Sequence, residues 1–354
     1  MGTVTTVILA ILVFGGLIFI HEFGHYITAR IFKVTITEFS IGMGPRLVWY
    51  DSKKTGIRYT LAMFPFGGFV SMPGESGEDE ETADDPNRFD KKPAWQRFII
   101  VGAGAFVNLL AGFIIMIIIT SVINIGSTTV ARFVDTEAEG YEVSSSDSGL
   151  MVNDEIIKVN GKSVSIVDEL SYEIMRNGYE PVDLVVIRGG EEITLEDVVF
   201  PTKSQQGETF GALDFYVYRA EKSFFGVLDT AMEKSFLIVR MCWESIYDLI
   251  TGRYSLAAVS GPVGISSAIG EAAQDEESTS LWHIVALISI NLGVMNLLPI
   301  PALDGAKMLT LLFEMVTKKR VPARIEGVIN AVGLALLLGL SFVVLIKDVF
   351  QLFG

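Results

Sequence analysis

The sequence predicts a polytopic α-helical membrane protein with about four transmembrane helices, a β-hairpin after the first of them, and a small inserted α+β domain. Half of the 354 residues are hydrophobic and the mean hydropathy is +0.46, which suits a chain with several spans. Four apolar stretches reach the roughly 20 residues that cross a bilayer. The net charge of −15 argues against nucleic acid as a partner and leaves the lipid bilayer as the expected surroundings.

The four predicted spans run from about 4 to 29, 98 to 125, 282 to 303 and 328 to 346. The first is expected to be retained, because MGTVTT lacks the basic residues of a signal peptide and no small-residue cleavage site follows the apolar run. The single cysteine, Cys242, has no intrachain disulfide partner, so we interpret it as a packing residue.

The region between the first two spans predicts a hairpin followed by an acidic loop. Strand-like segments at 46–50 and 57–70 flank a turn at 51–56. The acidic residues that follow are expected to form a solvated loop, with a dedicated cation site as the weaker alternative. These residues are Glu75, Glu78, Asp79, Glu80, Glu81, Asp84 and Asp85.

The longer polar region, between the second and third spans, predicts a compact α+β domain followed by an amphipathic segment. That segment, 224–250, is expected to lie on the membrane surface or to pack on the spans. The patterns within the domain are a strand at 129–135, a strand, turn and strand at 154–164, a helix at 166–176, and a hairpin at 182–200. The predicted parts are therefore an N-terminal membrane part (1–125), the inserted domain (129–203), a linker region (204–280) and a C-terminal membrane part (281–354).

Basic residues near the spans predict the orientation of the chain. They follow the first span, precede the second and separate the third from the fourth, so these loops are expected to be cytoplasmic and the inserted domain to lie outside. Arg132 and Lys347 disagree mildly with this assignment. The residues that carry it are Arg30, Lys33, Lys91, Lys92, Arg97, Lys318, Lys319, Arg320 and Arg324.

The HEFGH segment near the end of the first span predicts a metal site. His21 and His25 lie four apart and share one helix face, where both imidazoles can bind one zinc ion with Glu22 beside them as general base. HExxH is short and arises by chance, so the alternative is a packed core. That alternative is weak, because a glutamate deep in a span costs about 2.5–3.5 kcal/mol on insertion scales and such groups are rarely without function.

A catalytic zinc ion needs a third protein ligand, and two candidates exist. His283 lies at the outer start of the third span, on the opposite side of the membrane from His21 and His25. Asp304 comes late in a span of the same direction as the first, so it is expected at the same depth as the histidines. Pro299 and Pro301 would unwind the helix there, which is tolerated mainly where backbone lines a cavity. We therefore expect Asp304 to be the ligand.

Hydrolysis is the chemistry that this set favours. Two histidines and one carboxylate could also hold Fe(II) in an oxygenase, but a glutamate directly after a ligand favours a hydrolytic role. A helical substrate must unwind before attack, and the strand ending in Phe66-Gly67-Gly68-Phe69 offers an edge for strand addition. Gly67 and Gly68 would then contact substrate; the alternative is a purely structural hairpin.

The chain resembles the site-2 protease family, specifically its bacterial regulatory intramembrane proteases with an extracytoplasmic PDZ domain. The HEFGH segment at 21–25 resembles the family's zinc motif, and 296–305 is similar to its NxxPxPxLDG signature. Segment 66–75 looks like the loop after its membrane-associated hairpin, and SGPVGI at 260–265 like another element before the third span. The domain at 129–203 is similar to a bacterial PDZ domain.

The resemblance implies a zinc metalloendopeptidase of the inner or plasma membrane, with His21, His25 and Asp304 as zinc ligands and Glu22 as base. It implies that Asn296 and Asn108 contact substrate. The implied substrates are single-span membrane proteins, such as anti-sigma factors after a first cut outside, or remnant signal peptides. The active site would face the cytoplasmic side.

The sequence departs from the family pattern at two places, and two alternative functions remain open. Gly104-Ala105 stands where the family often has Gly-Pro, and Ala306-Lys307 where it usually has Gly-His. The rivals are a non-catalytic membrane scaffold that binds peptides through its PDZ domain, and a metal transporter. A transporter should carry several polar ligands in its spans, and the fourth span has no charged residue.

Overall fold

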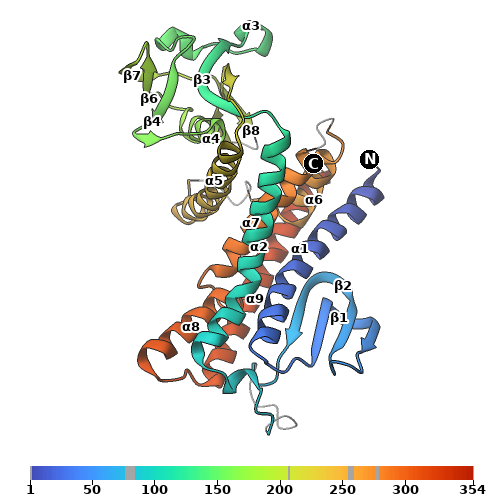
Figure 1. Cartoon of the computed structure of the whole chain (residues 1–354). Helices are drawn as coiled ribbons and strands as arrows, with labels where there is room; N and C mark the ends of the chain where they lie inside the picture. The colour runs from blue at the N-terminus through green and yellow to red at the C-terminus, as the bar shows by residue number, and fades with distance from the viewer. Residues whose placement is uncertain (1, 76–83, 206–207, 254–258, 276–278, 354) are drawn as a thin grey trace. The chain divides into compact units, whose positions relative to one another are not determined.

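The computed structural model describes residues 2–75, 84–205, 208–253, 259–275 and 279–353. The chain forms two compact units. Unit 1 comprises Met1–Ile115 and Val259–Gly354, and unit 2 comprises Met116–Ala258. Figure 1 shows the helices of unit 1 as a bundle beside the curved β1–β2 hairpin, and unit 2 as a sheet with its own helices.

Four helices in the described part of the chain are long and apolar enough to cross a membrane, which confirms the four predicted spans. Their 29-residue members would extend about 43 Å, more than the roughly 30 Å hydrocarbon core. The four are α1 (Thr3–Ile31), α2 (Ala94–Val122), α7 (Ser280–Leu297) and α9 (Ala323–Phe353).

The third span ends six residues earlier than predicted, at Leu297 instead of Leu303. Leu298 has extended backbone angles of φ −65° and ψ 144°, as expected for a residue that precedes proline. The chain turns through Pro299 and Pro301 and re-enters a helix at α8 (Asp304–Thr317), which the sequence pattern did not predict. The apolar run is therefore a helix followed by a bend, and the bend places Asp304 at the start of α8.

The hairpin of unit 1 is curled rather than flat. Its strands are β1 (Glu38–Asp51) and β2 (Arg58–Ser71), so the first begins eight residues before the predicted one. The start of β1 pairs with both ends of β2, since Phe39 faces Tyr59 in one pairing and Val70 in another. The end of β1 folds back on the start of β2. One edge of the sheet is consequently formed by the last residues of β2.

The short helix α6 (Pro262–Ala272) connects the C-terminal helices of unit 1 with the first span. It packs against α1, α7 and α9. The Asp348 carboxylate of α9 accepts hydrogen bonds from the backbone N–H groups of Gly261 (3.3 Å) and Gly264 (3.1 Å). These are donors that the start of a helix leaves unpaired, so Asp348 caps α6 from another helix. The SGPVG segment is thereby tied to the fourth span.

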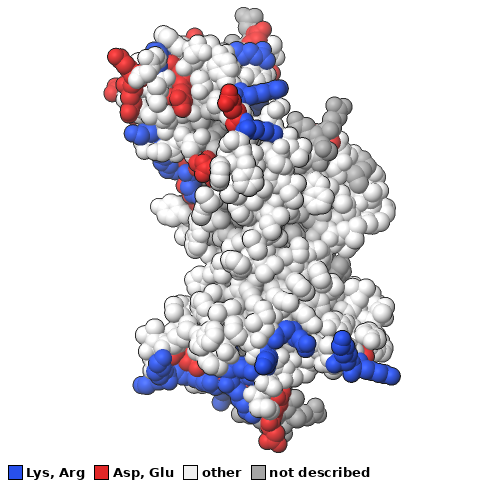
Figure 2. All heavy atoms as spheres, viewed as in Figure 1, with Lys and Arg blue, Asp and Glu red and all other residues white. Residues whose placement is uncertain are grey.

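On the face drawn in Figure 2, charged side chains of unit 1 gather at the end where α8 lies, and none shows on the surface of its middle. Buried Arg97 of α2 donates to Glu314 of α8 at 2.5 Å, and Arg320 donates to the same carboxylate at 3.1 Å. The 3-10 helix η2 (Phe89–Lys91) lies in the loop before α2. An uncharged band with a charged end is the pattern of a membrane-spanning bundle.

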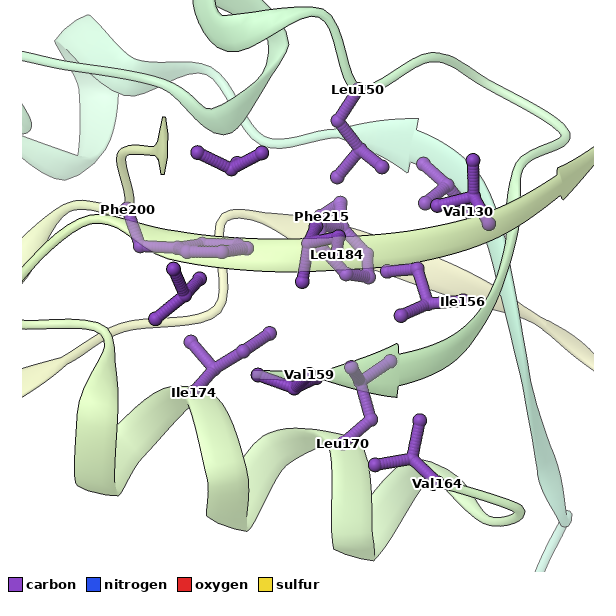
Figure 3. Packing of buried hydrophobic residues seen from close by; sticks show 13 residues of the cluster. Val130, Leu150, Ile156, Val159, Val164, Leu170, Ile174, Leu184, Phe200 and Phe215 are labelled. Carbon is purple, nitrogen blue, oxygen red and sulfur yellow. The ribbon is translucent and has the colours of Figure 1, made fainter. Parts of the chain in front are cut away.

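Unit 2 is built on a sheet with the order β10-β3-β4-β6-β7, with β5 paired to β4. Leu170 and Ile174 of α4 point at the inner face of the sheet, where they meet Leu184 and Phe215 (Figure 3). The strands are β3 (Gly126–Phe133), β4 (Glu155–Val159), β5 (Lys162–Ser163), β6 (Val182–Arg188), β7 (Glu191–Val198) and β10 (Phe215–Arg219), and β8 (Thr202–Gln205) pairs with β9 (Glu208–Gly211). The helices are α3 (Thr136–Glu139), η3 (Ser145–Ser148), α4 (Val167–Asn177) and α5 (Phe224–Thr251).

The inserted domain extends beyond the predicted boundary at 203. The last strand, β10, pairs antiparallel with the first, β3, through Phe215↔Phe133 and Tyr216↔Arg132. Phe215 is 3% exposed and belongs to the same core as Leu170 and Ile174. Because the pairing joins the two ends of the domain, no local pattern could reveal it, and the range 129–203 omits an edge strand.

The amphipathic segment at 224–250 is the single helix α5. One face is held on α4 by ion pairs: Arg240 donates to Glu173 at 2.8 Å, and Arg176 donates to Asp248 at 2.8 Å. Its other side carries large apolar residues that are exposed within the described part of unit 2. They are Phe225, Met232, Phe236, Trp243, Tyr247 and Ile250.

We expect Phe215→Ala to destabilise unit 2 by about 3–5 kcal/mol, the usual cost of removing a buried phenylalanine. Amide hydrogen exchange of the full-length protein would measure the free energy of opening of β3 and β4. Tyr216→Ala is the matched control, since the neighbouring side chain is 51% exposed. Equal effects of the two substitutions would show that β10 is not part of the core.

Candidate active site

The site begins with three side chains from two distant parts of the chain. His21 and His25 lie one turn apart on α1, and their Nε2 atoms are 3.2 Å apart. Asp304, the first residue of α8, brings its Oδ2 atom to 3.2 Å from the Nε2 atom of His21 and 3.4 Å from that of His25. His283 lies in the first turn of α7 and is not a member of this cluster.

The cluster has the shape and chemistry of a metal site. A tetrahedral zinc ion with ligands at about 2.0–2.1 Å separates its ligand atoms by about 3.3 Å, close to all three distances observed here. The Oδ2 atom of Asp304 is buried and makes no hydrogen bond to the described residues, although two imidazole nitrogens lie beside it. A buried carboxylate oxygen without a donor is costly unless a cation binds it.

The second-span helix α2 sets the position of both imidazoles. The Nδ1 atom of His25 lies 2.8 Å from the carbonyl oxygen of Ile100, which can only accept, so Nδ1 carries the proton and Nε2 keeps its lone pair. Gly104 lies directly under the rings: a Cβ atom there would be 2.4 Å from the Nε2 atom of His25 and 2.8 Å from that of His21. The absence of a side chain is what lets α2 approach.

Glu22 opens onto a cavity of about 460 Å³ beside the cluster. The cavity lies between α1 and the end of β2, and Gly68 backs onto the glutamate so closely that a Cβ atom would be 2.8 Å from the Glu22 Cγ atom. Its lining residues are Glu22, His25, Gly68, Phe69, Val70, Ser71, Met72 and Glu75. A carboxylate, an imidazole and a strand edge therefore share one space.

The remaining predicted site residues lie at different places. Gly67 adopts φ +80°, next to Gly68 in β2. Asn296 is half-buried in the last turn of α7. Asn108 of α2 is fully buried, with its amide nitrogen 3.3 Å from the Nδ1 atom of His21. Ile100 was not singled out from the sequence and Gly104 was noted only within the Gly104-Ala105 departure, because a backbone carbonyl and an absent side chain carry no local signal of a role in the site.

The acidic stretch after the hairpin is only partly a solvated loop. Glu75 is half-buried, lines the cavity and pairs with Lys307 of α8 at 2.9 Å, so this residue is held by an ion pair at the site. Asp85 accepts a hydrogen bond from the backbone N–H of Asn87 at 2.8 Å, and Asp84 is exposed. The predicted loop residues Glu78, Asp79, Glu80 and Glu81 lie outside the described residues.

A bundle of apolar helices that brings a His–His–Asp cluster next to a glutamate in a cavity is the arrangement expected of a metallohydrolase of the membrane. Comparison with known proteins identifies the particular class. Peptidase family M50 matches residues 9–340, and the chain belongs to this family. It is therefore a zinc-dependent metalloprotease with four apolar helices suited to a membrane, as the resemblance to the site-2 proteases predicted.

Relatives match over nearly the whole chain. A protein of Clostridium acetobutylicum whose name describes a zinc metalloprotease is 34% identical over 348 residues, covering 97% of each chain. The zinc metalloprotease RasP of Geobacillus kaustophilus is 29% identical, covering 99% of each. The regulator of sigma-W protease RasP of Bacillus subtilis is 24% identical, again covering 99% of each.

Proposed function

We propose that His21, His25 and Asp304 hold the zinc ion and that Glu22 is the general base in the hydrolysis of peptide bonds of single-span membrane proteins. The observation that carries the proposal is the convergence of three ligand atoms from α1 and α8, within 3.2–3.4 Å of one another, beside a cavity that Glu22 lines. A His–His–carboxylate set leaves a fourth position for water, which is the arrangement of catalytic zinc sites.

The bound zinc would lower the pKa of its water toward about 7 and polarise the scissile carbonyl. The Glu22 carboxylate takes the proton of the attacking water and delivers it to the leaving nitrogen. The Ile100 carbonyl holds the Nδ1 proton of His25, so that Nε2 stays available as a ligand. In this mechanism the ligand side chains and the Ile100 carbonyl position the metal site, and Glu22 transfers the protons.

The end of β2 is the proposed place for the substrate backbone. It forms an edge of the curled sheet and lines the Glu22 cavity through Gly68, Phe69 and Val70. An unwound substrate could add there as a further strand, with Gly67 and Gly68 allowing close approach. Asn296, in the last turn before the bend, is proposed to contact the same segment. The hairpin itself, with exposed apolar residues such as Trp49, is proposed to associate with the membrane.

The substrate class follows the relatives. A B. subtilis relative is named a regulator of sigma-W. We therefore propose an anti-sigma factor as a substrate, with remnants of signal peptides as the second class. The inserted domain, a sheet packed on α4, is proposed to be a PDZ domain outside the cytoplasmic membrane, with the active site toward the cytoplasm. Cleavage of a reconstituted single-span substrate, with the cut mapped by mass spectrometry, tests this function; cuts confined to soluble loops far from the span would contradict it.

The orientation predicts a labelling pattern. In a Cys242→Ala background, an impermeant thiol reagent should label the Ser204→Cys variant of intact cells and spare the Lys53→Cys variant. Both positions are exposed in the structure, Lys53 in the hairpin turn and Ser204 in β8. Permeabilised cells should label both variants. The reverse pattern in intact cells would invert the topology.

Gly104→Ala should cost most of the activity, because the added Cβ would have to displace imidazole nitrogens 2.4–2.8 Å away. A displacement of about 1 Å at a reacting site lowers the rate by about 100-fold. Gly102→Ala is the matched control: its Cβ meets only the flexible end of Met308, at 3.0 Å. Cleavage rate and zinc content of both variants would be measured. Equal activities would show that the close approach of α2 does not position the histidines.

A further inference from the structure

Asn108 is a fully buried amide inside the second-span helix, directed at a zinc-site histidine. Its side chain is 0% exposed, and its Nδ2 atom lies 3.3 Å from the Nδ1 atom of His21. The Oδ1 atom is buried and has no hydrogen-bond partner among the described residues. A buried amide with one unsatisfied oxygen is expensive, so its presence in an apolar helix calls for a reason.

The two histidines of the cluster need the same protonation pattern. His25 has it, since its Nδ1 atom faces a carbonyl oxygen and its Nε2 atom keeps a lone pair for the cluster. His21 also directs Nε2 at the cluster, 3.2 Å from Asp304. To bind a metal through that atom, its Nδ1 must carry the proton and donate it. An acceptor is therefore required at the place that the Asn108 amide occupies.

The Asn108 side chain can supply that acceptor. A half-turn of its amide exchanges oxygen and nitrogen within the same volume. The oxygen then accepts from the Nδ1 proton of His21, and an amide nitrogen takes its place on the unpartnered side. Each of the two amide orientations leaves one polar atom of Asn108 without a partner among the described residues, so the amide itself favours neither. The His21 imidazole makes the difference, because only the orientation with the oxygen toward Nδ1 leaves Nε2 free to bind the metal.

We propose that Asn108 is a positioning residue, whose side-chain oxygen accepts the Nδ1 proton of His21 and holds Nε2 toward the zinc. The inference rests on the proposed ligand set and replaces the substrate contact that resemblance suggested for Asn108. The Asn108 side chain is fully buried and directed at His21, and it is not among the residues that line the Glu22 cavity. Ser289 of α7 fixes the same point of α2, because its hydroxyl donates to the Asn108 carbonyl oxygen at 2.8 Å.

The test compares zinc affinity by chelator competition in the purified full-length chain, alongside zinc X-ray absorption. Asn108→Leu keeps the size and removes the acceptor, and it should weaken zinc binding by about 10- to 100-fold. Asn108→Asp keeps an acceptor oxygen but cannot donate, and it should bind zinc within a few-fold of the wild type. Asn291→Leu is the control: this α7 residue also has a buried Oδ1 atom without a hydrogen-bond partner among the described residues but is not a member of the cluster, and the variant should bind zinc normally.

Each result decides a separate point. Wild-type affinity in Asn108→Leu, or loss in Asn108→Asp as large as in Asn108→Leu, overturns the positioning role. If Asn108→Leu does not fold, a loss of more than about tenfold in Asn108→Asp has the same meaning. His21→Ala serves as the reference: undiminished zinc binding in that variant would refute the ligand set itself, whereas its loss together with normal Asn108→Leu refutes only the inference about Asn108.

Discussion

Glu22→Gln is expected to lower the rate of proteolysis by about 100-fold or more, while the protein keeps its zinc. Glutamine preserves the size of the side chain and its packing against Gly68, but it cannot take a proton from water at neutral pH. Glu22 is not part of the His21, His25 and Asp304 cluster, so the metal should stay. The measurement pairs cleavage of a reconstituted single-span substrate with zinc content of the same preparation.

A matched control separates loss of the base from a general effect of removing a carboxylate. Glu192→Gln, on the surface of β7 in unit 2, removes an equal charge from a side chain that is 61% exposed, and it should leave cleavage unchanged. Activity of Glu22→Gln close to that of the wild type would refute proton transfer by Glu22. Loss of zinc from the same variant would instead place the carboxylate among the ligands.

Asp304→Ala is expected to remove both zinc and activity. The substitution deletes one of three converging ligand atoms and leaves the two imidazoles without the carboxylate that lies 3.2 and 3.4 Å from them. Loss of a ligand should weaken binding beyond the 10- to 100-fold typical of losing an outer hydrogen-bonding partner. Zinc content, affinity and absorption spectra would be compared with the wild type.

The control for this substitution is another carboxylate near the end of a helix in unit 1. Asp348→Ala removes the cap of α6, so it should lower thermal stability without changing zinc affinity. Full zinc occupancy with unchanged coordination in Asp304→Ala would exclude Asp304 from the site. The bend after Leu297 would then need another explanation than the delivery of a ligand.

Features that depend on local pattern were predictable from the sequence. The spans appear as long apolar runs, and HEFGH places two histidines on one face of whichever helix contains it. The proximity of Asp304 to the two histidines could be predicted as well, because the first and third spans were expected to run in the same direction and to carry these residues at similar depth. The end of α7 was misplaced because apolarity continues through Pro299 and Pro301, where backbone geometry, not hydrophobicity, ends the helix.

Features that depend on pairing at a distance were not predictable in this way. β10 joins the sheet only because β3, more than 80 residues earlier, leaves an edge for it. Glu75 was placed in a loop by its acidic neighbours, but Lys307 of α8 determines its surroundings. The setting of His21 likewise depends on an asparagine from another helix. Sequence patterns describe the neighbours of a residue along the chain, whereas these contacts are made by residues that are far away in the sequence.

The volume of the Glu22 cavity has a consequence for the supply of the second reactant. The Glu22 cavity, of about 460 Å³, is much larger than the roughly 30 Å³ that one water takes up in the liquid, and its lining includes the polar side chains of Glu22, His25 and Glu75. It therefore has room beside the proposed base for the water that hydrolysis consumes. A substrate strand along β2 would take up part of that space, so water and substrate would compete for the same wall of the cavity.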